Sequence, residues 1–123
     1  MTDPIVVSDA VADALRAGRP VVALETTLVT HGLPQPDGLQ VAAALEAAVR
    51  DGGAIPATIG ILDGRLRVGL TAAQLAWLAD TPGVVKVNPG NMAALIASGG
   101  SGSTTVAATL FAAATAGIHV FAT

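Results

Sequence analysis

Val21-Val22-Ala23-Leu24-Glu25-Thr26-Thr27 is the stretch that decides the fold of this 123-residue chain. A run of apolar residues ending in polar ones is typical of a strand covered on both faces, as in parallel sheets. Glu25 lies where this strand should emerge into a loop. A carboxylate there must be hydrogen-bonded, paired or partly protonated, and those conditions also turn a glutamate into a general acid. A strand-end glutamate that points into solvent is an equally good interpretation.

Helices and short apolar strands alternate on both sides of this stretch. Asp37 with Gln40, and Thr71 with Gln74, have the spacing of capping boxes, and Asp63-Gly64 predicts a type I′ hairpin turn. The alternation predicts a single α/β domain over residues 1–123, layered α/β/α, with a mostly parallel, mixed sheet. The final strand leaves this sheet incomplete at the C-terminus, so we expect the N-terminal part of a longer fold. Helices are expected over 8–17, 37–50, 71 onward, 91–97 and 103–116, and strands over 21–26, 55–62, 65–68, 84–87 and 118–122.

Composition excludes several classes of function. Aromatic residues make up 2% of the chain and the net charge is −3, which argues against a nucleic-acid partner. No cysteine is present, so neither a disulfide framework nor a thiolate zinc site is expected. The first residues lack the pattern of a signal peptide, and no apolar run approaches the roughly 20 residues that cross a bilayer. We therefore expect a cytoplasmic protein without a membrane partner.

Lys86 is the only lysine, and it lies within the apolar run Val84-Val85-Lys86-Val87. A lysine in such a strand needs a partner for its charge or a lowered pKa, which favours a functional role. The structural alternative is an edge-strand lysine that discourages pairing between sheets.

Gly99-Gly100-Ser101-Gly102 is expected to form a flexible loop that leads directly into a helix beginning at Ser103. Free N–H groups at a helix start, together with hydroxyls, can bind phosphate, although a serine or threonine there is more often only a cap. His31 could be a base or a substrate contact, but loop histidines are more often solvated. His119 is expected to be structural, and the two histidines lack the spacing of metal ligands.

Taken together, these segments resemble the pseudouridine-5′-phosphate glycosidase family, also called indigoidine synthase A-like. The matching stretches run in order along nearly the whole chain: 22–27 with His31-Gly32-Leu33-Pro34, 53–59, 61–65, 84–87, 103–109 and 117–123. The family usually has a glycine in place of Ser103.

The resemblance implies an enzyme that cleaves the C–C glycosidic bond of pseudouridine 5′-phosphate, giving uracil and ribose 5-phosphate. Glu25 matches the proton donor, Lys86 a substrate-binding lysine, and Val106 a substrate contact beside Thr104 and Thr105. The family uses manganese and is typically a homotrimer. Its lysine nucleophile and metal-binding aspartate are expected beyond Thr123, so the chain as it stands is expected to be a truncated, inactive form.

Two other interpretations stay open. One is a non-catalytic module that binds a phosphorylated sugar or nucleotide through the glycine-serine-threonine segment. The other is a decayed or truncated product with no activity of its own.

Overall fold

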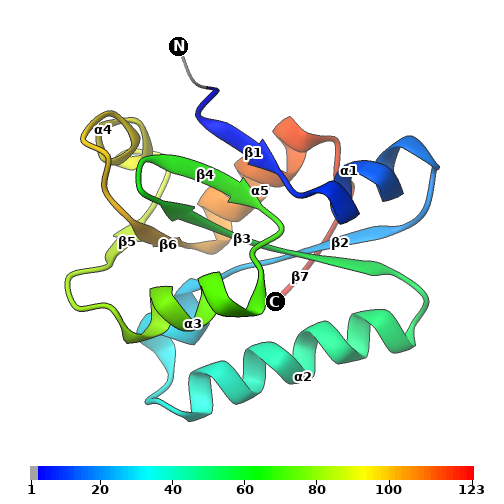
Figure 1. Ribbon diagram of the computed structural model, residues 1–123, viewed down its shortest axis with the longest axis horizontal. Coiled ribbons are helices and arrows are strands. Elements are labelled where there is room, and N and C mark those ends of the chain that lie inside the picture. Colours follow the sequence, from blue (N-terminus) through cyan, green and yellow to red (C-terminus); the bar gives the residue numbers. More distant parts are fainter. Residues whose placement is uncertain (1–2) are drawn as a thin grey trace.

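The computed structural model describes residues 3–123, in which a seven-stranded sheet lies between helices (Figure 1). In chain order the elements are β1 (Ile5–Val7), α1 (Asp9–Arg16), β2 (Val21–Leu24), the π-helical turn η1 (Leu28–Gly32), α2 (Asp37–Asp51), β3 (Ile55–Leu62), β4 (Arg65–Val68), α3 (Ala72–Asp80), β5 (Val85–Val87), α4 (Met92–Ala97), β6 (Gly102–Thr104), α5 (Val106–Ala116) and β7 (Val120–Ala122).

The helices form two layers, one on each side of the sheet. Helices α1, α4 and α5 pack on one face, where Val11, Ile59 and Ala112 belong to one buried cluster. Helices α2 and α3 lie with η1 on the other face, where Val29, Leu62 and Leu78 belong to a second cluster (Figure 1). This arrangement confirms the expected layered α/β fold. None of the helices in residues 3–123 is long and apolar enough to cross a membrane.

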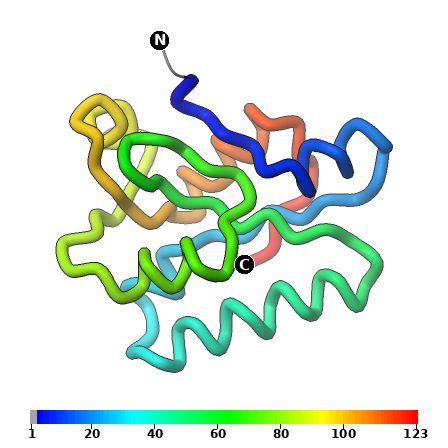
Figure 2. The backbone as a smooth tube through the Cα atoms, in the orientation of Figure 1, coloured from blue at the N-terminus to red at the C-terminus, as the bar shows by residue number. Residues whose placement is uncertain are grey.

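The sheet is mixed and mostly parallel, as expected. Strand pairs β1–β4, β2–β3, β2–β7 and β5–β6 are parallel, whereas β3–β4 and β3–β6 are antiparallel. The path of the tube in Figure 2 shows β7, at the C-terminal end, running beside β2. Strand β1 and the antiparallel pair β3–β6 were not expected from the sequence. Both involve three-residue strands, which are too short to give a clear alternation of apolar and polar residues.

Strand β3 is long enough to pair with two strands in succession along the same edge. The last register partner of β2 on β3 is Thr58, and the partner of Ser103 in β6 is Gly60. Because β2 is parallel and β6 antiparallel to β3, the carboxyl ends of β2 and β6 meet tip to tip beside Ile59. We call this place the strand junction, formed by residues 25–26, Ile59 and residues 104–105.

Hydroxyl groups close the strand junction. The carbonyl oxygen of Ile59 accepts hydrogen bonds from Thr26 Oγ1 and from Thr104 Oγ1, both at 2.8 Å. The backbone N–H of Thr104 donates to Thr26 Oγ1 at 2.8 Å, and Thr109 Oγ1 donates to Thr104 Oγ1 at 2.8 Å. All three threonines are completely buried. Two threonine side chains thus satisfy a carbonyl that lies in the gap between two strand ends.

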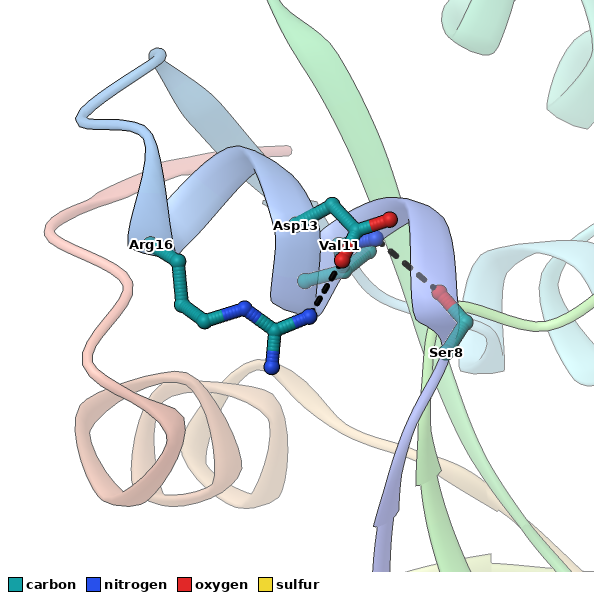
Figure 3. A network of polar contacts seen from close by, with 4 residues as sticks. All are labelled: Ser8, Val11, Asp13 and Arg16. Carbon is teal, nitrogen blue, oxygen red and sulfur yellow. Dashed lines mark hydrogen bonds and ion pairs between the residues drawn. The ribbon is translucent and has the colours of Figure 1, made fainter.

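Several local expectations are confirmed. Thr71 and Gln74 form a capping box at the start of α3. Asp63 and Gly64 both have positive φ, at 48° and 76°, as a type I′ turn requires. Figure 3 shows the start of α1, where Ser8 is the N-cap and its Oγ accepts from the Val11 N–H at 3.3 Å, while Asp13 pairs with Arg16.

Two expectations about helix starts are wrong. Residues 102–104 form β6, and α5 begins at Val106 after the N-cap Thr105. Gly102 is buried against β5, where a Cβ would lie 2.3 Å from Val87 Cγ2, so this glycine permits close strand packing and is not part of a flexible loop. Asp37 is the first residue of α2 and not its cap, because Pro36 is the N-cap and makes no side-chain cap bond. The N–H of Leu39 instead donates to Gln35 Oε1 at 3.3 Å.

The strand junction gives a test of stability. In Thr104→Val, the Ile59 carbonyl loses one donor and the buried Thr109 hydroxyl loses its acceptor, so we expect a loss of about 1–3 kcal/mol in the free energy of unfolding. Urea denaturation followed by circular dichroism measures this change. Thr115→Val is the matched control, because its exposed hydroxyl donates to the Phe111 carbonyl at 2.9 Å and its loss should cost much less. Equal losses in the two variants would contradict the proposed importance of the junction.

Candidate active site at the strand junction

Four of the site residues predicted from the sequence lie at or next to the strand junction. Glu25 follows β2, and Thr104, Thr105 and Val106 span the end of β6 and the start of α5. The backbone N–H of Thr26 donates to the Thr104 carbonyl at 3.3 Å, which joins the two segments directly. Ligand groups in open α/β sheets are commonly supplied where carboxyl ends of strands diverge. The structure therefore brings the Glu25 segment and the 104–106 segment into one place.

Glu25 is half-buried at the tip of β2. Its Oε1 accepts a hydrogen bond from the Thr123 hydroxyl, which lies beyond the end of the neighbouring strand β7. The other glutamate, Glu46, accepts from Thr58 Oγ1 at 2.6 Å and lies 3.6 Å from Arg50, so it ties α2 to β3. Glu25 has a hydroxyl partner and no cation within ion-pair distance among residues 3–123. Of the two carboxylates, Glu25 is the better placed to exchange a proton with a bound molecule.

Thr104, Thr105 and Val106 differ in what they can offer a ligand. Thr104 is completely buried and its hydroxyl is occupied at the strand junction, so its side chain supports the site and does not face a ligand. Thr105 caps α5 by accepting from the Ala108 N–H at 3.3 Å. Val106 is the first residue of α5 and is 41% exposed. The first backbone N–H groups of an α-helix such as α5 have no partner within the helix, and such groups commonly bind anions.

Lys86 occupies a different environment from the one its apolar neighbours suggested. It is exposed, and its strand β5 pairs with β6 alone, so β5 is an edge strand. This is the structural alternative considered for Lys86. However, Lys86 is the register partner of Ser103, one residue before the strand junction. Cross-strand partners share a face of the sheet, so Lys86 lies on the same face as Ser103.

A second hydrogen-bonded group lies beside the strand junction. The sequence singled out His31 and Ser103 separately, but it missed Thr30 and gave no sign that these residues meet. Ser103 Oγ lies 2.7 Å from Thr30 Oγ1 and 3.0 Å from His31 Nδ1, and His31 Nε2 lies 3.2 Å from the Val84 carbonyl oxygen. Ser103 is completely buried, whereas His31 is exposed. Because Ser103 belongs to a strand that the sequence did not predict, its contact with His31 could not be anticipated.

The described residues do not suit a metal ion by themselves. Residues 3–123 contain no group of three or more histidine, aspartate or glutamate side chains arranged to hold one. A manganese ion prefers several oxygen or nitrogen ligands, and Glu25 is the one carboxylate at the strand junction within this part of the chain.

Comparison with known proteins agrees with the motifs. The sequence model of the family described as indigoidine synthase A like protein matches residues 10–123. A pseudouridine-5′-phosphate glycosidase of Jannaschia sp. (strain CCS1) is 55% identical over 123 residues, covering 100% of this chain and 41% of that protein. One from Rhodospirillum centenum is 56% identical, covering 100% of this chain and 38% of that protein. The chain thus spans about two fifths of the length of these curated relatives.

Two solved structures share the fold. The prealnumycin C-glycosynthase AlnA, in complex with ribulose 5-phosphate, has a TM-score of 0.87 and 44% identity, covering 100% of this chain and 39% of that chain. An indigoidine synthase A-like protein of Thermotoga maritima has a TM-score of 0.86 and 29% identity, covering 100% of this chain and 40% of that chain. The family match, the identities and the shared fold together show that this chain belongs to the indigoidine synthase A-like family, whose curated relatives are named pseudouridine-5′-phosphate glycosidases.

Proposed function

We propose that this chain forms the N-terminal part of a pseudouridine-5′-phosphate glycosidase. The observation that carries the proposal is the 55% identity to a named glycosidase over the whole chain. The geometry supports it, because Glu25 and the start of α5 meet at the strand junction. The solved C-glycosynthase, bound to ribulose 5-phosphate, supports a phosphorylated sugar as the class of ligand.

The reaction needs an acid because carbon is a poor leaving group. When the bond between ribose and uracil breaks, its electron pair remains on the uracil carbon, which must take up a proton. Glu25, half-buried and hydrogen-bonded to a hydroxyl, is proposed to deliver that proton. The ribose carbon would be held by a lysine nucleophile beyond Thr123 and released by water as ribose 5-phosphate. Lys86 is not assigned that role.

The substrate phosphate is proposed to lie between Lys86 and the first turn of α5. There the Val106 backbone and the helix dipole provide positive potential, and the N-cap Thr105 fixes the start of the helix. Manganese is proposed as the family's metal, with ligands supplied by the rest of the polypeptide. A cytoplasmic location and a homotrimeric assembly are likewise proposals that follow from the family.

Glu25→Gln tests the proton donor. The full-length polypeptide is best provided as a chimera, in which this chain is followed by the C-terminal part of the Jannaschia relative. Glutamine can still accept from Thr123 but cannot supply the proton, so we expect kcat to fall roughly 10²–10⁴-fold with KM nearly unchanged. Uracil release measured by chromatography gives both constants. Glu46→Gln is the matched control, and undiminished turnover in Glu25→Gln would remove Glu25 from the mechanism.

Lys86→Ala tests the phosphate contact. Because Lys86 is exposed, solvent screens its charge, and we expect substrate affinity in the chimera to fall by about tenfold, with a loss that shrinks at high salt. Arg16→Ala, which removes an exposed cation on α1, should leave affinity unchanged. Normal substrate binding by Lys86→Ala would instead support a purely edge-protecting lysine.

Experiments on the isolated 123-residue chain distinguish the glycosidase hypothesis from the hypothesis of a module that binds a phosphorylated sugar. We expect no uracil release from the isolated chain, with or without manganese, because the proposed nucleophile and metal ligand belong to the rest of the polypeptide. Chromatography of the products and calorimetry with ribose 5-phosphate test this. Uracil release by the isolated chain would contradict the assignment of the nucleophile. Tight, metal-independent binding together with an inactive chimera would favour the binding module.

A further inference from the structure

The imidazole of His31 joins three separate elements. It belongs to η1, its Nε2 lies 3.2 Å from the Val84 carbonyl oxygen just before β5, and its Nδ1 lies 3.0 Å from Ser103 Oγ in β6. Both ring nitrogens therefore have partners, even though the residue is exposed. A histidine engaged in this way is not free to act as a base unless it breaks one of these contacts.

The partners fix one tautomer of the neutral ring. A carbonyl oxygen can only accept, so Nε2 must carry the proton that is donated to Val84. Nδ1 then accepts from the Ser103 hydroxyl, and the Ser103 oxygen accepts in turn from Thr30 Oγ1 at 2.7 Å. Thr30 also lies 2.8 Å from Nδ1 and 3.2 Å from the Thr26 carbonyl oxygen. Because the Thr30 hydroxyl has one proton, its donation to Ser103 excludes donation to the Thr26 carbonyl, and the chain of hydrogen bonds runs from Thr30 through Ser103 and the imidazole to the Val84 carbonyl just before β5.

The strand next to this chain of hydrogen bonds is paired along one edge only. β5 is a three-residue edge strand whose pairing is confined to β6, and Val85 and Lys86 are exposed. The ladder continues past both ends of β6, because the Val85 N–H donates to the Ser101 carbonyl at 3.2 Å and the Thr105 N–H donates to the Val87 carbonyl at 3.0 Å. Beyond this ladder, the Lys86 carbonyl accepts from Asn91 Nδ2 at 3.1 Å, and the Val84 carbonyl accepts from His31. The Asn91 contact is local in sequence, since the two residues are five apart. His31 is 53 residues from Val84 and ties β5 to the segment that leaves β2 after Glu25.

We propose that His31 is a positioning residue that holds the Lys86 strand in register with the strand junction, and so sets where Lys86 meets the substrate phosphate. This inference rests on the proposed function for the role of Lys86. His31 acts through β5 and does not itself touch the substrate. Its loss should therefore resemble a partial loss of Lys86, raising KM while the proton transfer from Glu25 continues.

Kinetics of the chimera provide the first test. We expect His31→Ala to raise KM about fivefold with kcat changed less than about twofold, and the double variant with Lys86→Ala to be no worse than Lys86→Ala alone. His31→Gln places an amide N–H near the position of Nε2 and should restore KM, whereas the shorter His31→Asn should not. His119→Ala, which changes the other histidine, is the matched control. Additive losses in the double variant, an unchanged KM in His31→Ala, or failure of His31→Gln to restore KM would overturn the proposal.

The second test does not depend on activity. The chain has two histidines, so a long-range proton–nitrogen NMR spectrum of the 123-residue protein at alkaline pH resolves both imidazoles. We expect His31 to be the Nε2–H tautomer alone and Ser103→Ala to weaken that preference, with the exposed His119 unchanged. A mixed or Nδ1–H tautomer for His31 would overturn the proposal. An inactive parent chimera would refute the glycosidase, and this spectrum would then decide whether His31 makes the contact.

Discussion

The carbonyl oxygen of Ile59 joins the end of β2 to the end of β6, because both strands end beside it and do not pair with each other. Thr26 at the tip of β2 and Thr104 at the tip of β6 each donate a hydroxyl to the same oxygen. Without these donors, the buried carbonyl would have no hydrogen-bond partner in the gap between the two strand ends, and this would lower the free energy of unfolding. The chain needs threonine at both positions because its hydroxyl is short and its branched side chain suits strand geometry.

The same junction explains why the candidate active site lies where it does. Two strand tips that meet must turn away from one another, and here β2 leads into the η1 segment while β6 leads into α5. The turn after β2 carries Glu25, and the turn after β6 supplies the helix start. The proposed acid and the proposed anion-binding groups thereby lie on a scaffold that is held by buried hydrogen bonds, and a positioned catalytic group requires such a scaffold.

Much of the fold follows from local sequence. The apolar run 21–24, the Asp63-Gly64 turn and the Thr71–Gln74 capping box each specify their structure within a few residues, and all three are found. The predictions that were wrong concern segments whose structure depends on tertiary contacts. The local sequence of 103–104 predicts a helix start, but pairing with β3 and β5 makes it part of strand β6. Glu25 could be selected from its place after a strand, but the buried state of Thr104, the exposure of Lys86 and the partners of His31 depend on that unforeseen strand.

Strand β3 has a consequence for how this protein can tolerate insertions and deletions. It is paired with β2, β4 and β6 at once, and its side chains alternate between two separate cores, with Ile59 and Ile61 in one and Leu62 in the other. One added residue in β3 would exchange the two faces beyond the insertion and misalign three neighbouring strands together. The same addition in the turn at 88–90 lies on the surface and disturbs no strand pairing. An added residue should therefore be tolerated in an exposed turn such as 88–90 and not within β3.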